Sequence, residues 1–359
     1  MNKIKVILFS LVLTISILIT NSIAENENSL SDLQIGAFYF PGWDSKSWHW
    51  NRAKNLKEFK EREPLEGWDN IDKPEYMKKE IDWAFSHGIN FFAFDWYWNF
   101  IDKKEGLSTE KINLNYALSN FLAVNNKMSF SIMWANHYKL PKDINEYKVI
   151  ADLWKTKYFN NKYYLKTSDK RPIIYFFSFQ PIVESIGEKG LIEFIEYIKD
   201  NTNAYVICIN DIYNDNYQNK KLKHYGFDAI TGWSYLYWVL KIQNTGEISF
   251  DKYKTVFKKV KEDIENNTEN IIYPTIMMGW DTRPWIRNPK YILSECKADD
   301  FANLLRWSGE LLKNKNYKEN ILMLQSWNEF GEGSYIIPTK KEGFSYLDKI
   351  KEFKDNLLK

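Results

Sequence analysis

Short apolar runs recur along the chain, and polar segments with a helical period separate them. The runs are nearly continuous in apolar or aromatic side chains, as expected for strands that are covered on both faces of a parallel sheet. We count eight such runs: Ile35–Phe40, Ile89–Asp95, Phe130–Ala135, Ile173–Phe177, Tyr205–Ile209, Ala229–Gly232, Ile271–Met278 and Ile321–Gln325.

The segments between these runs have the apolar stripe of amphipathic helices. The clearest are Tyr76–Ser86, Leu114–Val124, Leu191–Lys199, Tyr253–Ile264 and Phe301–Leu312. Alternating strands and helices indicate a parallel α/β sheet, and eight units without a Gly-rich dinucleotide-binding turn favour a closed barrel over a doubly wound sheet. We therefore predict a (β/α)8 TIM barrel that forms a single domain over residues 25–359.

Residues 1–24 have the pattern of a secretory signal peptide. Lys3 and Lys5 precede an apolar run from Val6 to Ile19, and Ser22-Ile23-Ala24 is a small-x-small cleavage site. No later stretch of the sequence is long and apolar enough to suggest a membrane span. We expect a secreted or periplasmic protein with no membrane span after signal cleavage, with an uncleaved anchor as the alternative.

The charge balance gives no reason to expect a nucleic-acid partner. Two of the 49 basic residues lie in the signal segment, which leaves 47 basic and 47 acidic residues in the rest of the chain. The four His have no zinc-site spacing, and motifs for serine hydrolases, phosphate-binding loops and dinucleotide binding do not occur. We expect no cofactor or metal, with a bound calcium as the open alternative, and a monomer. Cys208 and Cys296 do not make a disulfide framework, although one bridge between them stays open.

Polar and aromatic residues follow the C-terminal ends of the predicted strands, where barrel enzymes carry their active sites. The longest loops at these ends are Pro41–Pro74, Trp96–Asn113 and Gly279–Ala298. Many of the 15 Trp lie there, and the flat C–H faces of sugar rings stack on such side chains. Each aromatic has the alternative of closing the barrel core. The strand-end residues are Tyr39, Asp95, Trp96, Tyr97, Asn136, His137, Asn210, Asp211, Trp233, Trp280, Asp281, Arg283, Glu329 and Glu332.

The last strand run is followed by two carboxylates three residues apart, Glu329 and Glu332, in a Gly-rich turn. Glycoside hydrolysis typically uses two carboxyl groups on either side of the scissile bond. Gly331 and Gly333 allow the backbone to bend so that both acids face one cavity. The simpler alternative is that both are solvated loop acids, as most Glu residues are.

The segment Trp327–Pro338 resembles the NEWxEGxxIEP motif of family 99 glycoside hydrolases and of bacterial relatives that are labelled glycosyltransferase-like. Ile35–Pro41, Gly88–Tyr97 and Met278–Pro284 resemble the same group, so the likeness spans nearly the whole chain after the signal segment. The resemblance implies a (β/α)8 barrel, in agreement with the strand count.

The resemblance also implies a mechanism with retention at the anomeric carbon. Glu329 would take the proton of the sugar's 2-hydroxyl, which forms a 1,2-anhydro sugar, and Glu332 would protonate the leaving oxygen and later activate water. This assignment requires a raised pKa for Glu332. With the strand ends, it gives these candidate substrate-binding residues: Tyr39, Trp43, Asp95, Trp96, Tyr97, Asn136, Trp233, Trp280, Asp281, Arg283, Trp327, Asn328 and Tyr335.

Three positions depart from the family pattern, so the sugar is not assumed to be mannose. Phe330 replaces a second Trp, Gly331 replaces a larger polar residue and opens the turn, and Ile337 replaces the Glu before Pro338. We expect a secreted retaining glycoside hydrolase for α-linked oligo- or polysaccharides, with an endo-acting α-mannosidase as one form of it. The alternatives are a glycosyltransferase-like protein of polysaccharide biosynthesis and a non-catalytic carbohydrate-binding barrel. Asp95 either binds a sugar hydroxyl or caps the next segment, and Asp281 and Arg283 either bind substrate or form a local ion pair.

Overall fold

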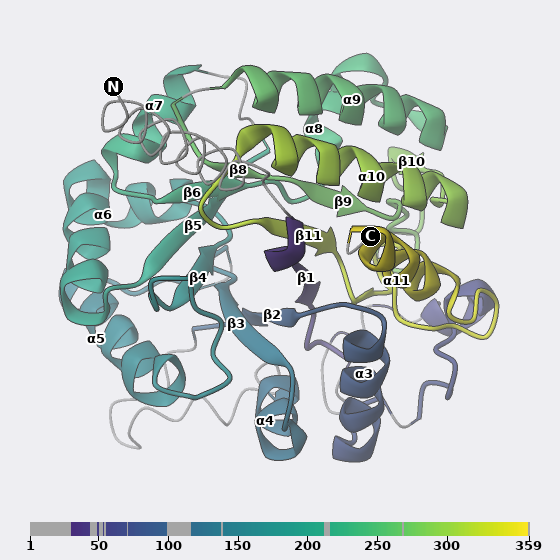
Figure 1. The fold of residues 1–359 in the computed structure, drawn as a ribbon, viewed down its shortest axis with the longest axis horizontal. Helices are drawn as coiled ribbons and strands as arrows, with labels where there is room; N and C mark the ends of the chain where they lie inside the picture. Colours follow the sequence, from purple (N-terminus) through teal and green to yellow (C-terminus); the bar gives the residue numbers. More distant parts are fainter. Residues whose placement is uncertain are drawn as a thin grey trace, which may run out of the picture.

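The computed structural model describes residues 30–43, 49, 53, 55–69, 71–98, 116–137, 139–211, 216–267 and 269–357. The predicted signal segment lies outside these residues. Parallel strands form a sheet at the centre, and helices surround it (Figure 1). The strands are β1 (Gln34–Tyr39), β2 (Phe91–Trp96), β3 (Ser129–Trp134), β4 (Ile173–Phe176), β5 (Tyr205–Ile209), β6 (Ala229–Thr231), β8 (Ile272–Tyr273), β9 (Thr275–Met277) and β11 (Ile321–Gln325).

The sheet closes into a barrel through its seventh predicted run. The strand order is β8-β6-β5-β4-β3-β2-β1-β11-β9, and β8 and β9 are consecutive pieces of one run that Pro274 divides. Proline has no N–H to donate to a neighbouring strand, which explains the break. Because β8 pairs with β6 and β9 pairs with β11, the two ends of the sheet meet in this run. The prediction of a (β/α)8 barrel is confirmed.

Helices follow the strands and cover the outside of the barrel (Figure 1). They contain the five predicted helical segments, apart from residues 114–115, which lie outside the described residues. α6 begins well before its predicted start, with non-helical backbone at Gly187. The helices are α3 (Pro74–Ser86), α4 (Tyr116–Val124), α5 (Ile144–Trp154), α6 (Gln180–Thr202), α7 (Asn216–His224), α8 (Leu236–Ile242), α9 (Phe250–Asn266), α10 (Ala298–Lys315) and α11 (Ser345–Leu357).

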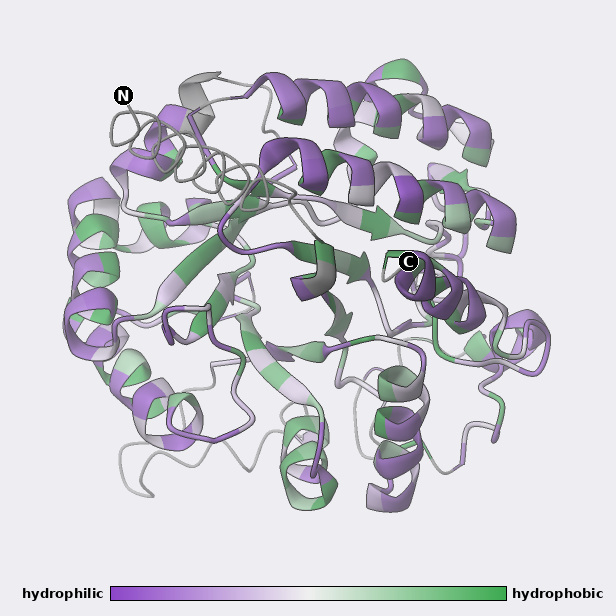
Figure 2. Cartoon of the chain, viewed as in Figure 1, coloured by the Kyte–Doolittle hydropathy of each residue, from purple (hydrophilic) through white to green (hydrophobic). Residues whose placement is uncertain are grey.

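The distribution of apolar residues explains this arrangement. Figure 2 shows apolar strands in the centre and helices whose outer faces are polar. In α9, the buried residues Tyr253, Val256, Phe257, Val260 and Ile264 recur every three or four positions, which gives the helix one apolar face toward the barrel. None of the described helices is both long and apolar enough to cross a membrane.

Short elements decorate the barrel. Two pairs of strands lie outside the main sheet: β7 (Gly246–Ile248) with β10 (Tyr291–Leu293), and β12 (Asn328–Glu329) with β13 (Ser334–Tyr335). The helical turns are η1 (Leu30–Asp32), η2 (Leu56–Glu58), η3 (Lys60–Arg62) and the π-helical η6 (Lys155–Phe159). Cys208 and Cys296 are buried free thiols, so the bridge that the sequence left open is not formed.

Candidate active site

A cavity of about 580 Å³ opens at the C-terminal end of the barrel strands. Its wall is built from residues at or just after the ends of β1, β2, β3, β4, β6, β9 and β11, so most of the barrel contributes to it. The volume lies in the range of small-ligand sites. The lining residues are Phe40, His49, Asp95, Tyr97, Met133, His137, Phe177, Trp233, Trp280, Thr282, Trp285, Ile286, Glu329 and Glu332.

Three carboxyl groups, Asp95, Glu329 and Glu332, share this cavity. Asp95 and Glu329 are each 6% exposed, and Asp95 Oδ1 and Glu329 Oε2 have no hydrogen-bond partner among the described residues. Glu332 is only partly buried, and its Oε2 lies 3.5 Å from Nε2 of Gln325. Buried polar atoms are normally hydrogen-bonded, so these two cavity-lining acids keep acceptor capacity that the described residues do not use.

Burial makes all three acids weaker acids than usual. It raises the pKa of Glu332 to about 8, and it raises the pKa of Glu329 well above the ordinary value, with further increases from the charges of Glu332 and Asp95. Burial and the charge of Glu332 raise the pKa of Asp95. Glu332 therefore has the raised pKa that we expected, but the pKa of Glu329 is raised as well. The group keeps at least one proton at neutral pH.

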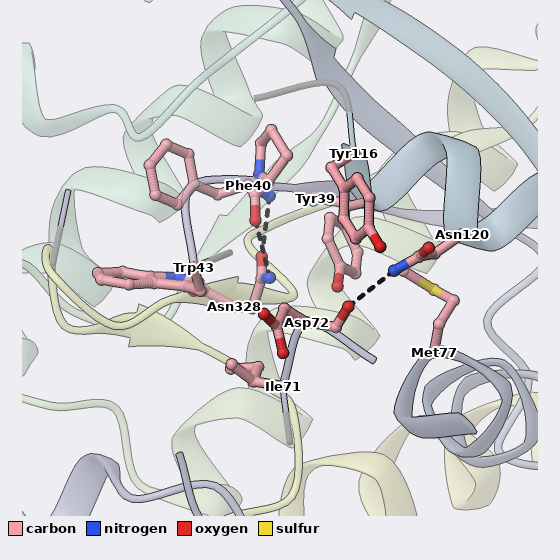
Figure 3. A pocket seen from close by; sticks show the side chains of 11 residues that line it. Tyr39, Phe40, Trp43, Ile71, Asp72, Met77, Tyr116, Asn120 and Asn328 are labelled. Atoms are coloured by element: carbon pink, nitrogen blue, oxygen red, sulfur yellow. Dashed lines mark hydrogen bonds between the residues drawn. The ribbon is translucent and has the colours of Figure 1, made fainter. Parts of the chain in front are cut away.

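Trp327, Asn328 and Trp43 fix the backbone of the turn that carries Glu329, and they do not line the cavity. The Asn328 amide donates to the carbonyl of Phe40 (2.9 Å) and accepts from its N–H (2.8 Å), as Figure 3 shows. Nε1 of Trp43 donates to the carbonyl of Asn328 (2.8 Å). The pocket drawn in Figure 3, about 20 Å³, has room for a water molecule rather than a sugar.

Tyr39 lies outside the cavity, between the barrel and α3. Its hydroxyl donates to Glu80 Oε2 (2.9 Å), and Nε1 of Trp327 donates to Glu80 Oε1 (3.0 Å). Glu80 is completely buried, and burial raises its pKa to about 8. Sequence analysis missed this acid because it sits within the amphipathic pattern of a helix.

Gly331 does not open the turn, contrary to the sequence prediction. A Cβ built at this position would overlap the indole of Trp285, so the space beside the glycine is filled by this cavity-lining ring. Trp285 stacks on Trp43 with ring centroids 5.6 Å apart. Phe330 is fully buried against Trp43 and Trp68 and is not part of the cavity wall.

Asp281 and Arg283 form the local ion pair that was one of the two alternatives. Arg283 Nε and Nη2 donate to the Asp281 carboxylate at 2.8 and 2.7 Å, and both residues lie outside the cavity wall. Arg62 makes a second ion pair with Asp281, which the sequence did not suggest. The neighbours Trp280 and Thr282 do line the cavity.

Three further candidates lie behind the wall. Trp96 is fully buried and donates to the Tyr158 hydroxyl (3.3 Å), and the Tyr335 hydroxyl donates to the carbonyl of Glu61 (3.3 Å). The Asn136 side chain bonds to the backbone of Ser178. Six candidates line the cavity: Asp95, Tyr97, Trp233, Trp280, Glu329 and Glu332. Within the described parts of the chain, no three His, Cys, Asp or Glu residues are close enough to hold a metal ion.

Solved structures with the same fold include carbohydrate-active enzymes. A "glycoside hydrolase-like protein" matches with a TM-score of 0.62 and 18% identity over 90% of this chain and 94% of that one. A GH99 endo-alpha-mannosidase from Bacteroides thetaiotaomicron in complex with bis-tris propane matches with a TM-score of 0.61 and 12% identity over 90% and 97%. At these identities the likeness establishes the fold alone. No curated protein sequence matches the chain.

The sequence itself matches a protein family. The family model described as "Glycosyltransferase WbsX" covers residues 59–350, which is most of the chain. This match includes α3, all barrel strands except β1, and the turn with Glu329 and Glu332. The chain therefore belongs to the WbsX glycosyltransferase-like family, a group of carbohydrate-active proteins by its description, and has the barrel fold of GH99 enzymes.

Proposed function

We propose that this protein is an exported glycoside hydrolase that cleaves α-linked oligo- or polysaccharides with retention of anomeric configuration. The observation that carries the proposal is the convergence of Asp95, Glu329 and Glu332 on one cavity with aromatic walls. Two of these acids, Asp95 and Glu329, present buried oxygens that have no hydrogen-bond partner in the part of the chain that the structure describes. The signal segment predicted at residues 1–24 would deliver the protein out of the cytoplasm.

The reaction divides between the two glutamates. Glu329 takes the proton of the sugar's 2-hydroxyl while O2 attacks the anomeric carbon, the bond to the leaving oxygen breaks, and Glu332 transfers its proton to that oxygen. In the second step Glu332 takes a proton from water and the water oxygen attacks the anomeric carbon of the 1,2-anhydro sugar. The bond between that carbon and O2 breaks, and Glu329 returns its proton to O2. Two opposite displacements give net retention, an exception to schemes with a carboxylate nucleophile.

The electrostatics of the cavity support this division. The scheme starts with one proton on the pair, and the raised pKa values of both acids keep a proton there at neutral pH. A carboxylate with a raised pKa is also a stronger base, which suits the removal of a hydroxyl proton by Glu329.

The remaining wall suits a sugar ring. Tyr97, Trp233, Trp280 and Trp285 offer aromatic faces for C–H groups, and Asp95 offers an acceptor for a hydroxyl. Trp233 is held in place by its backbone N–H, which donates to Asp211 (2.6 Å), and by the rings of Phe38 and Phe177. We assign substrate binding to these residues. The other sequence candidates do not line the cavity.

The family description favours one alternative, transfer of a sugar to an acceptor other than water. A transferase that uses a nucleotide sugar must bind a diphosphate, and none of the described residues that line the cavity is a Lys or Arg that would pair with it. The charge of the wall therefore favours hydrolysis of a neutral glycan.

The test is hydrolysis of a panel of α-linked glycans, mannans included, with products resolved by mass. The purified protein should cleave at least one glycan, and E329Q and E332Q should lower its rate by roughly 10²- to 10⁴-fold, as expected for general acid–base groups. E262Q, an exposed acid on α9, is the matched control and should retain full activity. Glycan binding without cleavage by the wild type would point instead to a carbohydrate-binding barrel.

A further inference from the structure

Arg62 is a buried cation beneath the turn that carries Glu329 and Glu332. It lies at the end of η3 in the loop after β1, and only 3% of its surface is exposed. Its guanidinium stacks over the ring of Phe59, 4.5 Å from the centroid. A buried guanidinium is costly unless it is paired and hydrogen-bonded, so its partners explain its place in the fold.

Its partners connect two loops that are distant in sequence. Nη1 donates to the carbonyl of Phe330 (2.7 Å) and to the carbonyl of Asp281 (3.1 Å), and Nη2 donates to the Asp281 carboxylate. Phe330 lies between the two glutamates of the turn. The fork of one guanidinium thus holds the catalytic turn and the loop after β9 at a fixed separation.

A second hydrogen bond fixes the same turn two residues further along the chain. The N–H of Asp281 donates to the carbonyl of Glu332 at 2.6 Å. Gly333 packs so closely here that a Cβ would lie 3.2 Å from the backbone nitrogen of Asp281 and 3.3 Å from Nη2 of Arg62. Arg62 and Asp281 together hold the backbone at 330 and 332, on both sides of Gly331.

We propose that Arg62 is a positioning residue that, with Asp281, sets the distance between the two catalytic carboxyl groups and keeps Glu332 turned toward the cavity. The proposal rests on the proposed function for the roles of the two glutamates. Arg62 does not line the cavity and touches no reacting atom. It acts through the carbonyl of Phe330 and through Asp281.

Arg283 provides a matched control. It pairs with the same carboxylate, and its guanidinium lies 5.2 Å from the centroid of the same Phe59 ring. However, 47% of its side chain is exposed, and within the described residues no hydrogen bond joins it to the turn that carries the two glutamates. In R62M, Asp281 still keeps Arg283 as its partner, so no unpaired buried charge results. In R283M, Asp281 keeps Arg62 and the turn is still held.

The activity experiment compares R62M, R62K and R283M. R62M should lower kcat by roughly 10- to 100-fold with KM changed little, because a displacement of about 1 Å costs that much in catalysis. R62K keeps the charge but lacks the planar fork whose two nitrogens donate to Phe330 and Asp281, so it should recover only part of the loss. The alkaline limb of the R62M pH profile should move to lower pH as Glu332 becomes better solvated. R283M should keep kcat within about threefold of wild type, and the alkaline limb of its pH profile should lie within a fraction of a pH unit of the wild-type limb.

Hydrogen–deuterium exchange tests the same role without any substrate. Amides of residues 329–333 should exchange faster in R62M than in wild type or R283M, with exchange in β1 to β6 unchanged. The positioning role would be overturned if the amides of the turn exchanged at the wild-type rate in R62M. It would also be overturned if they exchanged faster while kcat and the alkaline limb stayed as in wild type. Failure of wild type to cleave any glycan would count against the proposed function alone, since the exchange result stands separately.

Discussion

The indole of Trp285 lies directly over Gly331, in the space that a β-carbon would occupy. The backbone at 331 is not in the left-handed region, so alanine fits its conformation and the ring is the obstacle. G331A should therefore displace Trp285 and destabilise the protein by about 1–3 kcal/mol, the usual cost of overpacking. Urea unfolding measures the change.

The matched test adds W285A. If the clash is the cause, the double variant G331A/W285A should be less destabilised than the sum of the two single variants, because the alanine then enters vacated space. Strict additivity of the two effects would mean that Gly331 is required for another reason.

The rate should fall as the pH rises through about 8. Glu332 donates a proton in the first step, and burial raises its pKa to about 8, so the protonated fraction declines above that value. An aryl glycoside with a good leaving group needs no proton from Glu332, and its cleavage should lose the alkaline limb. The same limb for both substrates, or a limb near pH 5, would rule out Glu332 as the acid.

The cavity should discriminate against acidic sugars, and more strongly at higher pH. Glu332 gains negative charge as the pH rises toward its raised pKa of about 8. Inhibition by a neutral oligosaccharide and by its uronic acid analogue, measured at pH 6 and pH 8, should show a preference for the neutral ligand that grows by roughly tenfold. E332Q should remove this growth of the preference with pH. Equal inhibition by the two ligands at both pH values would contradict the prediction.

The free energy of unfolding should decrease as the pH rises from about 4.5 to about 8, because Glu80 loses its proton in this range. Its pKa is raised in the folded protein, so the folded state binds the proton more tightly than the unfolded state does, and this stabilisation is lost as the pH rises. One such group changes the free energy of unfolding by at most about 1.4 kcal/mol per pH unit. Urea unfolding across this range should give a shallower decline for E80Q than for wild type. Parallel curves would place the pKa of Glu80 near its ordinary value.

The barrel could be predicted because its strands are covered on both faces. A run such as Phe91–Phe94 is apolar throughout, which is typical of a strand covered on both faces, and eight such runs indicate the fold. The break at Pro274 was visible in the sequence, but its role in joining β6 to β11 depends on pairing between distant strands.

The cavity wall was predicted in part, and strand alternation explains the part that failed. Asp95 and Tyr97 point into the cavity, whereas Trp96 between them points to the opposite face and Tyr158. In the same way Phe40 lines the cavity and Tyr39 points outward to Glu80. Treating every residue at a strand end as a site residue ignored this period of two.

Arg62 and Glu80 had no local signal of their roles. Arg62 bonds to Phe330 across 268 positions, and Glu80 bonds to Trp327 across 247. Contacts of this kind depend on how the loops pack once the barrel has formed. The spacing of Glu329 and Glu332, by contrast, is a local feature and could be recognised before the fold was known.

In the proposed reaction, Glu329 and Glu332 transfer a glycosyl group to water. Cleavage of the best glycan of the panel in ¹⁸O-labelled water, followed by mass spectrometry of the products, tests it most directly. We expect one ¹⁸O atom at each new reducing end with wild type, and the loss of this labelled product with E332Q. New glycosidic products without ¹⁸O, or labelled cleavage that E332Q leaves unchanged, would contradict it.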